Sequence, residues 1–277
     1  MSDPRASLLF ALADDELILG HRLSEWTGWV PYIEEDLALS SIAQDEIAHA
    51  RMLLEILSVI DGRDPDALAL GRQPSEYRNA ILCEQPNSDF AFTLARHWLY
   101  DHADDVRLRA LQESSFKELR EAVAIMLLEE RYHLEHADAW FRRLADGPVD
   151  ARHRFGEALA SAFRMADAVF EPLDNESELV SDGALPVASA DLRDAWQARI
   201  GGMLDEVGFD QVLAAHTEPT TGEMVPTSTG EIEASADPTP GPRTLGADGR
   251  RGEHSEHFEP LWLEMTALYR AHPGARW

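Results

Sequence analysis

The chain has 277 residues with 51 acidic and 24 basic side chains, a formal net charge of −27, and a hydrophobic content of 44%. This length and composition predict a globular protein with a sizeable core and exclude a disordered chain. The negative charge argues against nucleic acid and anionic membranes as partners, because both require a basic face. No apolar run reaches the roughly 18 residues of a membrane span, and the N-terminus lacks the pattern of a secretory signal.

The cysteine and lysine content indicates the environment of the protein. Cys83 is the only cysteine, which excludes a disulfide scaffold and cysteine-based metal sites and predicts a reducing cytoplasm. Lys117 is the only lysine, and all other basic residues are arginine. A strongly acidic, nearly lysine-free chain is typical of a salt-saturated, halophilic cytoplasm, where screening weakens self-repulsion. A GC-rich genome that replaces lysine by arginine is the alternative.

The spacing of hydrophobic residues predicts an all-α protein. Apolar side chains recur at intervals of three, four and seven residues from Ser7 to Glu25, before Gly28 and Pro31 end the pattern. Further helices are predicted at about 33–60, 77–84, 90–112, 115–144, 152–170, 191–207 and 255–271. A capping box of Ser115 and Glu118 is predicted to open the helix at 115–144. No segment alternates at period two, so no sheet is expected.

Residues 215–249 interrupt the helical pattern. They are rich in Thr, Pro, Gly, Glu and Asp and nearly free of large apolar side chains. Such a segment cannot bury enough apolar surface to fold, so a solvated, flexible insert is predicted. Because the helical pattern resumes after it, residues 1–277 are expected to form a single helical domain.

Two predicted helices carry the same metal-binding pattern, Glu-x-x-His. Glu46 and His49 lie in the helix at 33–60, and Glu130 and His133 lie in the helix at 115–144. Residues three apart share one face of a helix, so a carboxylate and an imidazole can reach the same ion. One such motif is weak evidence. Two of them, each on the later helix of a hairpin, predict a four-helix carboxylate site that holds two metal ions.

Geometry locates the carboxylates of the other two helices. Antiparallel helices place two residues at the same depth when both lie equally far from the turn. Glu16 and Glu46 are symmetric about Pro31, and Asp101 and Glu130 are symmetric about the turn expected between the two later helices. The sequence therefore predicts that Glu16 and Asp101 complete the ligand set.

This donor set favours particular metals. Ionisable groups on core-facing helix stripes are very costly to bury unpaired, and metal ions supply the compensating charge. Four carboxylates with two histidines suit iron or manganese, whereas zinc favours closed four-coordinate sites. The alternatives are a solvated acidic surface or a buried salt-bridge cluster. Asp104 and Asp105 are rivals for the place of Asp101.

Small residues lie one helical turn from the predicted ligands, at Ala13, Gly20, Ala43 and Ala50. Larger side chains there would fill a core better, at about 0.8 kcal/mol for each buried methylene. Small residues beside a metal therefore predict a pocket for an aromatic ring. Close packing between helices explains them equally well.

Several longer stretches resemble a known family. They are RLSEW (22–26), EDLAL (35–39), EQPN (84–87), RYHL (131–134), and HSEH (254–257) with its closing helix and Trp277. Together they resemble the C subunit of ring 1,2-phenylacetyl-CoA epoxidase over nearly the whole chain apart from residues 215–249. The resemblance implies a ferritin-like four-helix bundle with additional C-terminal helices.

The resemblance also implies an activity and its partners. The family belongs to a multicomponent di-iron monooxygenase that epoxidises the aromatic ring of phenylacetyl-CoA in aerobic phenylacetate catabolism. The implied cofactors are two iron ions, with O2 as co-substrate. The implied partners are a sister A subunit, a small bridging B subunit, and an iron–sulfur flavin reductase that draws electrons from NADPH.

The ligand set departs from the family pattern. In familiar bacterial systems the di-iron site lies in the A subunit, and the C subunit resembles it without a full set of ligands. In this chain all six positions are filled, by Glu16, Glu46, His49, Asp101, Glu130 and His133. Either the chain is itself catalytic, or it is a scaffold component with a vestigial or stabilising site. Iron storage or peroxide scavenging is a third, less favoured class.

Two weaker features lie near the C-terminus. His254 and His257 suggest a second metal site, although hydrogen-bonding histidines beside a helix capped by Ser255 are the favoured alternative. Arg250 and Arg251 suggest contacts to the phosphates of CoA. A solvated position in a flexible acidic segment is the favoured alternative for this pair.

Overall fold

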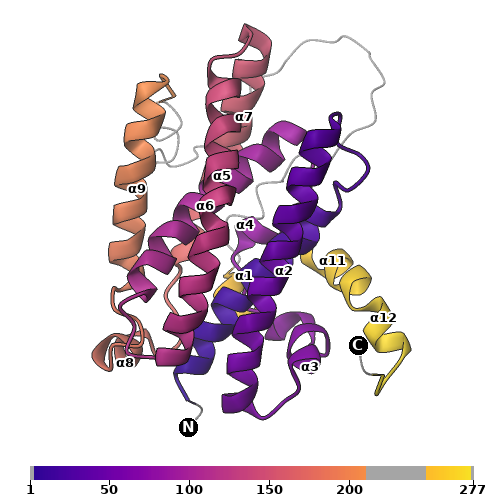
Figure 1. Cartoon of the computed structure of the whole chain (residues 1–277), viewed down its shortest axis with the longest axis vertical. Helices are drawn as coiled ribbons and strands as arrows, with labels where there is room; N and C mark the ends of the chain where they lie inside the picture. The colour runs from indigo at the N-terminus through magenta and orange to yellow at the C-terminus, as the bar shows by residue number, and fades with distance from the viewer. Residues whose placement is uncertain (1–2, 210–247, 276–277) are drawn as a thin grey trace, which may run out of the picture.

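Residues 3–209 and 248–275 are described by the computed structural model, and within these ranges the secondary structure is helical with no strand. Two helical hairpins form the central bundle (Figure 1). Their helices are α1 (Arg5–Ser24), α2 (Ile33–Asp61), α5 (Phe90–Leu111) and α6 (Lys117–Ala145). All four lie within two residues of their predicted ranges. The all-α, ferritin-like fold is confirmed.

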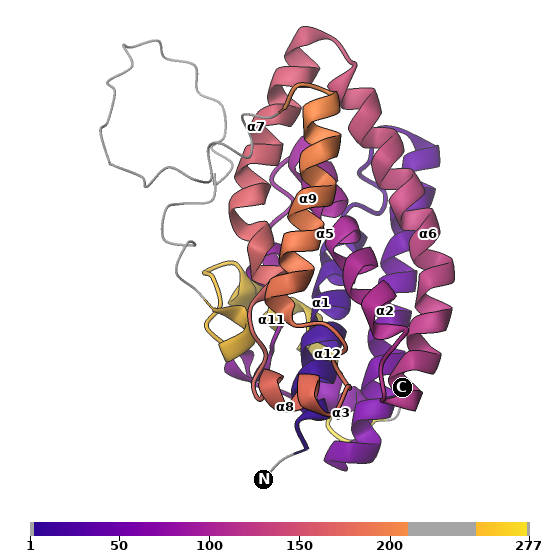
Figure 2. The same cartoon turned by 90° about the vertical axis from the view of Figure 1, so that its left-hand side faces the viewer.

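Shorter helices complete the molecule around the bundle. α7 (Val149–Ala166) and α9 (Ser189–Glu206) lie along α5 (Figure 2). α11 (Phe258–Met265) packs on the turn η1 (Pro74–Glu76) and is followed by α12 (Ala267–Ala271). The remaining elements are α3 (Pro65–Leu70), α4 (Ile81–Glu84), η2 (Asp167–Phe170), α8 (Glu176–Ser181) and η4 (Gly249–Arg251).

Helix α1 is buried on several sides, and its acidic side chains are as inaccessible as its apolar ones. Asp14, Asp15 and Glu16 are consecutive in the sequence, and none of them has exposed surface. Three successive residues on a helix point in directions about 100° apart, so these carboxylates face different neighbours. Burying a carboxylate is costly without a partner, and each of the three must therefore find one inside the protein.

Close packing of α1 on α2 explains one of the small residues. A Cβ added to Gly20 would lie 2.8 Å from Ile47 Cγ1 and 3.1 Å from the carbonyl oxygen of Ala43. The absence of a side chain at Gly20 therefore lets the two helices approach, which favours helix packing over a pocket at this position. For Ala13, Ala43 and Ala50, all of them buried, the pocket remains a prediction.

The predicted capping box at the start of α6 is wrong. The N-cap residue is Phe116, and no side chain caps this helix end. The Ser115 amide instead donates to the carbonyl oxygen of Gly183 at 2.9 Å. The segment that follows α8 thus lies across this turn and takes up the Ser115 amide. Neither α8 nor this contact was predicted.

The predicted helix at 255–271 is divided in two. Ser255 is not its N-cap residue: the N-cap of α11 is His257, whose side chain makes no capping bond, and Ser255 Oγ accepts from the His257 amide at 3.3 Å. The break comes at Thr266, whose hydroxyl donates to the carbonyl oxygen of Trp262 at 2.6 Å, a contact that bends helices. The insert predicted at 215–249 lies outside the described residues except for positions 248 and 249.

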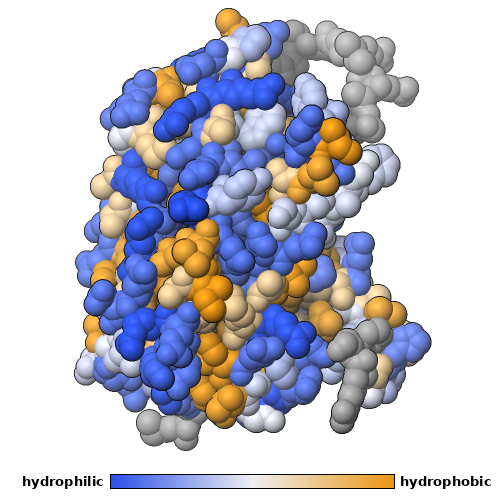
Figure 3. All heavy atoms as spheres, in the orientation of Figure 1, coloured by the Kyte–Doolittle hydropathy of each residue, from blue (hydrophilic) through white to orange (hydrophobic). Residues whose placement is uncertain are grey.

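The surface is mostly hydrophilic on the face seen in Figure 1, with a band of hydrophobic side chains in its lower half (Figure 3). Residues of α2 and α6 line a hollow of about 520 Å³ whose apolar side chains include Met52, Ile56, Val59 and Ile125. No helix among the described residues is both long and apolar enough to cross a membrane.

Candidate metal centre

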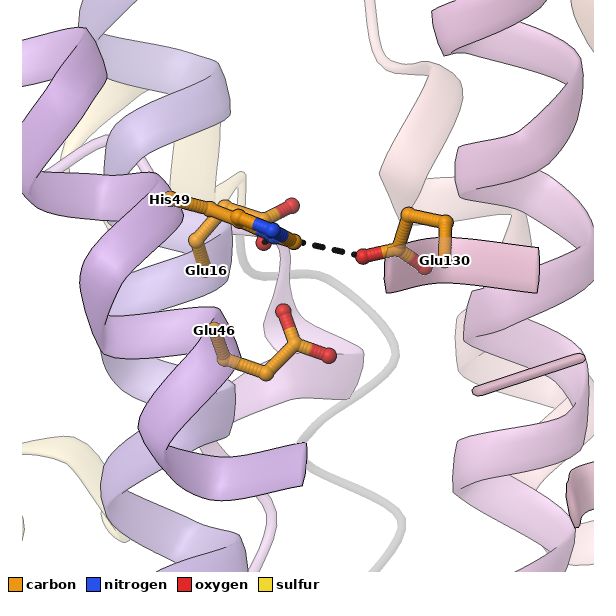
Figure 4. Close-up of side chains that lie close together, drawn as sticks. All are labelled: Glu16, Glu46, His49 and Glu130. Atoms are coloured by element: carbon orange, nitrogen blue, oxygen red, sulfur yellow. Dashed lines mark hydrogen bonds and ion pairs between the residues drawn. The ribbon is translucent and has the colours of Figure 1, made fainter. Parts of the chain in front are cut away.

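Acidic and imidazole side chains from α1, α2 and α6 converge at mid-height in the bundle. Glu16 comes from α1, Glu46 and His49 from α2, and Glu130 from α6 (Figure 4). One ligand atom from each of these four residues lies within 4.8 Å of the other three. All four residues are buried. The hairpin symmetry used to choose Glu16 therefore places it at the depth of the two Glu-x-x-His motifs.

The contacts that His49 and His133 make with these carboxylates are short, and most of them run between helices. His49 Nδ1 lies 3.3 Å from Glu16 Oε2 and 3.3 Å from Glu130 Oε1. His133 Nδ1 lies 3.2 Å from Glu130 Oε1 and 3.6 Å from Glu46 Oε1. Atoms that bind one metal ion with bonds of about 2.1 Å are separated by distances of this order.

Asp101, the sixth predicted ligand, is placed differently. It is fully buried on α5, but it is not one of the four residues that share the 4.8 Å group. Its Oδ1 atom lies 3.1 Å from Nδ1 of His97, one helical turn away. The charges of Glu130 and His133 nevertheless act on Asp101. The structure thus brings five of the six predicted residues into direct contact and leaves Asp101 beside them.

Unpaired buried oxygen atoms show that this group fits a cation. Both carboxylate oxygens of Glu46 and both of Asp101 are buried without a hydrogen-bond partner among the described residues. An unsatisfied buried carboxylate is strongly unfavourable, and native proteins rarely tolerate one. Divalent metal ions bound by oxygen and nitrogen would satisfy these atoms, and the donor set is the one that iron or manganese accepts.

The electrostatics of the group show the same need for positive charge. Burial, together with repulsion from Glu16 and Glu130, raises the pKa of Glu46 well above its usual range. Burial alone would lower the pKa of His49, but hydrogen bonds to Glu130 and Glu16 outweigh it and raise that pKa to about 11. Burial would also lower the pKa of His133, but the charge of Glu130 and hydrogen bonds to Asp45 and Glu130 together outweigh it and raise that pKa to about 10.

The outer nitrogen of each histidine is held by an acid from the opposite helix. His49 Nε2–H donates to Glu129 Oε2 at 2.7 Å, and His133 Nε2 lies 3.4 Å from Asp45 Oδ2. Outer carboxylates of this kind fix the ring of a metal-binding histidine and raise its basicity. These acids were not predicted from the sequence, although the residue directly before each predicted glutamate ligand of α2 and α6 is acidic.

A tyrosine that was not predicted from the sequence also contacts the group. The hydroxyl of Tyr100 on α5 donates to Glu16 Oε1 at 3.0 Å. Tyr100 is fully buried. It precedes Asp101 in the sequence, and its face of α5 could not be told from the apolar pattern because α5 is buried nearly all round.

The two C-terminal features have structural partners. His254 Nδ1 lies 2.8 Å from Glu84 Oε2, so this histidine pairs with a buried acid of α4. Arg251 is half-exposed and pairs with Asp174, as a solvated arginine would. Arg250 is buried instead, with 4% of its surface exposed, and the prediction that it is solvated is wrong.

Two comparisons with known proteins identify the family of the chain. Residues 2–223 match the family model described as phenylacetic acid catabolic protein. The chain is also 30% identical over 267 residues, 96% of both chains, to the C subunit of 1,2-phenylacetyl-CoA epoxidase from Escherichia coli (strain K12). On this evidence of sequence, with the helical bundle that accompanies it, the chain belongs to the phenylacetic acid catabolic protein family.

Proposed function

We propose that this chain is a subunit of a multicomponent di-iron monooxygenase that epoxidises the aromatic ring of phenylacetyl-CoA, and that it holds its own di-iron site. The similarity to the C subunit of the E. coli epoxidase supports the reaction class and the substrate. The observation that carries the proposal is the buried convergence of Glu16, Glu46, His49 and Glu130. The full proposed ligand set adds Asp101 and His133.

Each protein group would make a distinct contribution. Two iron ions bound here would supply the redox chemistry that activates O2. The carboxylates of Glu16, Glu46 and Glu130 balance the charge of the ions, and their burial excludes bulk water from the site. Glu129 and Asp45 hold the rings of His49 and His133 from outside.

The surface supports association with partner subunits. Trp29, Tyr32, Ile33 and Leu37 follow one another at the α1–α2 turn and are 80%, 56%, 68% and 66% exposed. Exposed large apolar side chains that lie near one another in the sequence are candidates for an interaction site. The proposed partners are a sister A subunit, a bridging B subunit, and an NADPH-dependent iron–sulfur flavin reductase that delivers electrons.

A scaffold role is the second candidate, and one observation favours it. Asp101 lies against His97 rather than within the four-residue group, so one of the two ions would lack a ligand unless Asp101 turns toward it. In that case the site would stabilise the fold, and a sister subunit would perform the oxidation.

We also place the protein in a salt-rich cytoplasm. The supporting observations are the net charge of −27, the single lysine at position 117, and the single cysteine, Cys83, which is buried and unpaired. A thiol that stays reduced fits this compartment. The proposal of a salt-rich cytoplasm is tested by how the melting temperature of the chain depends on salt concentration.

Reconstitution of the complex separates the catalytic role from the scaffold role. The chain with Glu46→Ala is combined with the partner subunits, reductase, NADPH, O2 and phenylacetyl-CoA, and epoxide formation is measured. A catalytic site predicts that product falls to background, whereas Glu55→Ala on the exposed face of α2 serves as the matched control and keeps full activity. Undiminished turnover with Glu46→Ala would assign the chain to the scaffold role.

A further inference from the structure

Arg250 is buried against Asp15 of α1, the residue before the candidate ligand Glu16 in the sequence. Its guanidinium donates to both carboxylate oxygens of Asp15, each at 2.8 Å. It also donates to the backbone carbonyls of Ala11, Arg78 and Val169 at 3.1, 2.7 and 2.8 Å. One side chain of η4 thus joins α1, the segment before α4, and η2.

Glycines on both sides of Arg250 make this entry possible. A Cβ on Gly249 would lie 2.0 Å from the carbonyl oxygen of Asn79. Gly252 has a φ of +77°, and a Cβ there would lie 2.1 Å from the carbonyl oxygen of Ser75. Only glycine fits so close to the neighbouring backbone. The segment is therefore shaped to bring its arginine to α1.

Hydrogen bonds continue from Asp15 to the metal centre. Arg107 of α5 donates through Nη1 to Asp15 Oδ2 at 2.6 Å and through Nη2 to the hydroxyl of Tyr100 at 3.1 Å. Tyr100 in turn donates to Glu16 Oε1 at 3.0 Å. Arg250 is thus connected to the candidate ligand Glu16 through an unbroken series of buried contacts.

The charges along this series depend on one another. Arg107 also donates to Asp104 Oδ1 at 2.6 Å, so Arg107 and Arg250 together face two aspartates, Asp15 and Asp104. Without Arg250, Asp15 would keep only the Ala80 amide and Arg107 as its donors. An under-compensated buried carboxylate attracts the nearest cation strongly. Arg107 would then be drawn toward Asp15 and away from Tyr100.

We propose that Arg250 is a positioning residue for the metal centre, which acts through Asp15, Arg107 and Tyr100 to fix the carboxylate of Glu16. This inference rests on the metal site proposed above. The inference gives the segment at 248–252 a role beyond stabilising the fold. Through Arg250 this segment orders Glu16, a candidate ligand that lies more than 230 positions earlier in the sequence.

Titration of the full chain with Co²⁺ tests the proposal, because the visible absorption of the bound ion reports its coordination. The variants are Arg250→Met, the exposed neighbour Arg251→Met as control, Arg250→Lys as the conservative change, and Tyr100→Phe. Replacing an outer partner of a metal ligand typically weakens binding by about 10- to 100-fold. We expect Arg250→Met to weaken Co²⁺ binding at least about tenfold and to change the absorption bands. Arg251→Met should leave both unchanged, and Arg250→Lys should recover part of the loss.

The proposed series of contacts also predicts the result for a double variant. In the Tyr100→Phe background the connection is already broken, so Arg250→Met should add little further loss of Co²⁺ affinity. Arg250→Met that lowers the melting temperature but keeps the parent's affinity and spectrum would overturn the proposal, as would losses that multiply in the double variant. If Arg250→Met does not fold, Arg250→Lys decides by the same criteria. A parent chain that binds no Co²⁺ would overturn the metal site itself.

Discussion

At the scale of single residues, the two histidines of the candidate centre are held in a crosswise manner. Each lies on one of the helices α2 and α6, and the acid that bonds its outer nitrogen lies on the other, directly before a glutamate of the centre. Glu129 and Glu130 together contact both rings, whereas Asp45 and Glu46 both lie beside the ring of His133. A change in the spacing of the two helices would disturb both histidines together.

Glu129→Gln tests the outer contact of His49. Glutamine keeps a hydrogen-bond acceptor but removes the negative charge, so the ring becomes less basic and less firmly oriented. We expect metal affinity to fall by about tenfold, at the lower end of the range for such partners. Metal content after dialysis against a chelator gives the measurement, with Glu135→Gln on the exposed face of α6 as control. Equal retention of metal in both variants would contradict the account.

Residue patterns predicted the centre better than they predicted its surroundings. Glu16 follows from hairpin symmetry, because helix length and turn position are readable from hydrophobic spacing. The contact of Tyr100 and the crosswise acids depend on which faces of two helices meet, and that is a tertiary property. Arg250 was missed for a related reason: its place is set by the close backbone approach of Gly249 to Asn79, which composition does not reveal.

At the scale of elements, the segment at 248–252, which carries Arg250, meets η2 at a pair of acidic side chains. Burial, with a hydrogen bond and repulsion from Asp248, raises the pKa of Glu171 from 4.5 to about 7. The nearby cation is Arg250, whose charge acts in the opposite direction. Glu171 therefore holds a proton in the folded chain at acidic pH, and repulsion from Asp248 acts on it when the proton leaves.

Glu171→Gln tests the contribution of this pair to stability. Between pH 4.5 and about 7 the folded chain binds a proton at Glu171 that the unfolded chain has lost, so this group makes stability fall as pH rises through the window. The variant lacks this decline and should be more stable than the parent above pH 7. Because the side chain is partly exposed, we expect a difference of about 1 kcal/mol.

Urea denaturation of parent and variant at a series of pH values provides the measurement, and Glu178→Gln in the exposed first turn of α8 is the control. A difference between parent and Glu171→Gln that is the same at pH 5 and pH 8 would show that Glu171 does not hold a proton in the folded chain.

At the scale of the whole molecule, the charge of −27 is distributed between two environments. A few acids are buried with partners, such as Asp14 with Arg72 and Asp15 with Arg107 and Arg250. Many other acids within the described ranges are exposed to water. Their mutual repulsion opposes the compact state unless salt screens it.

The melting temperature is therefore expected to rise with salt. The Debye length falls from about 30 Å at 0.01 M to about 3 Å at 1 M, so the repulsion between surface carboxylates is nearly removed at high salt. Scans of the full chain in 0.01 to 3 M KCl measure the effect, and sucrose of equal osmolality controls for exclusion from the surface. A melting temperature that does not change across this range would contradict a salt-adapted protein.

Metal analysis of the chain purified under iron-replete conditions tests the central claim most directly. With ligands from four helices we expect about two iron atoms per chain. Glu130 contacts both histidines, so Glu130→Ala should remove nearly all of the iron while the helical content stays close to that of the parent. Iron far below one atom per chain, at a level that Glu130→Ala does not change, would contradict the assignment of the centre.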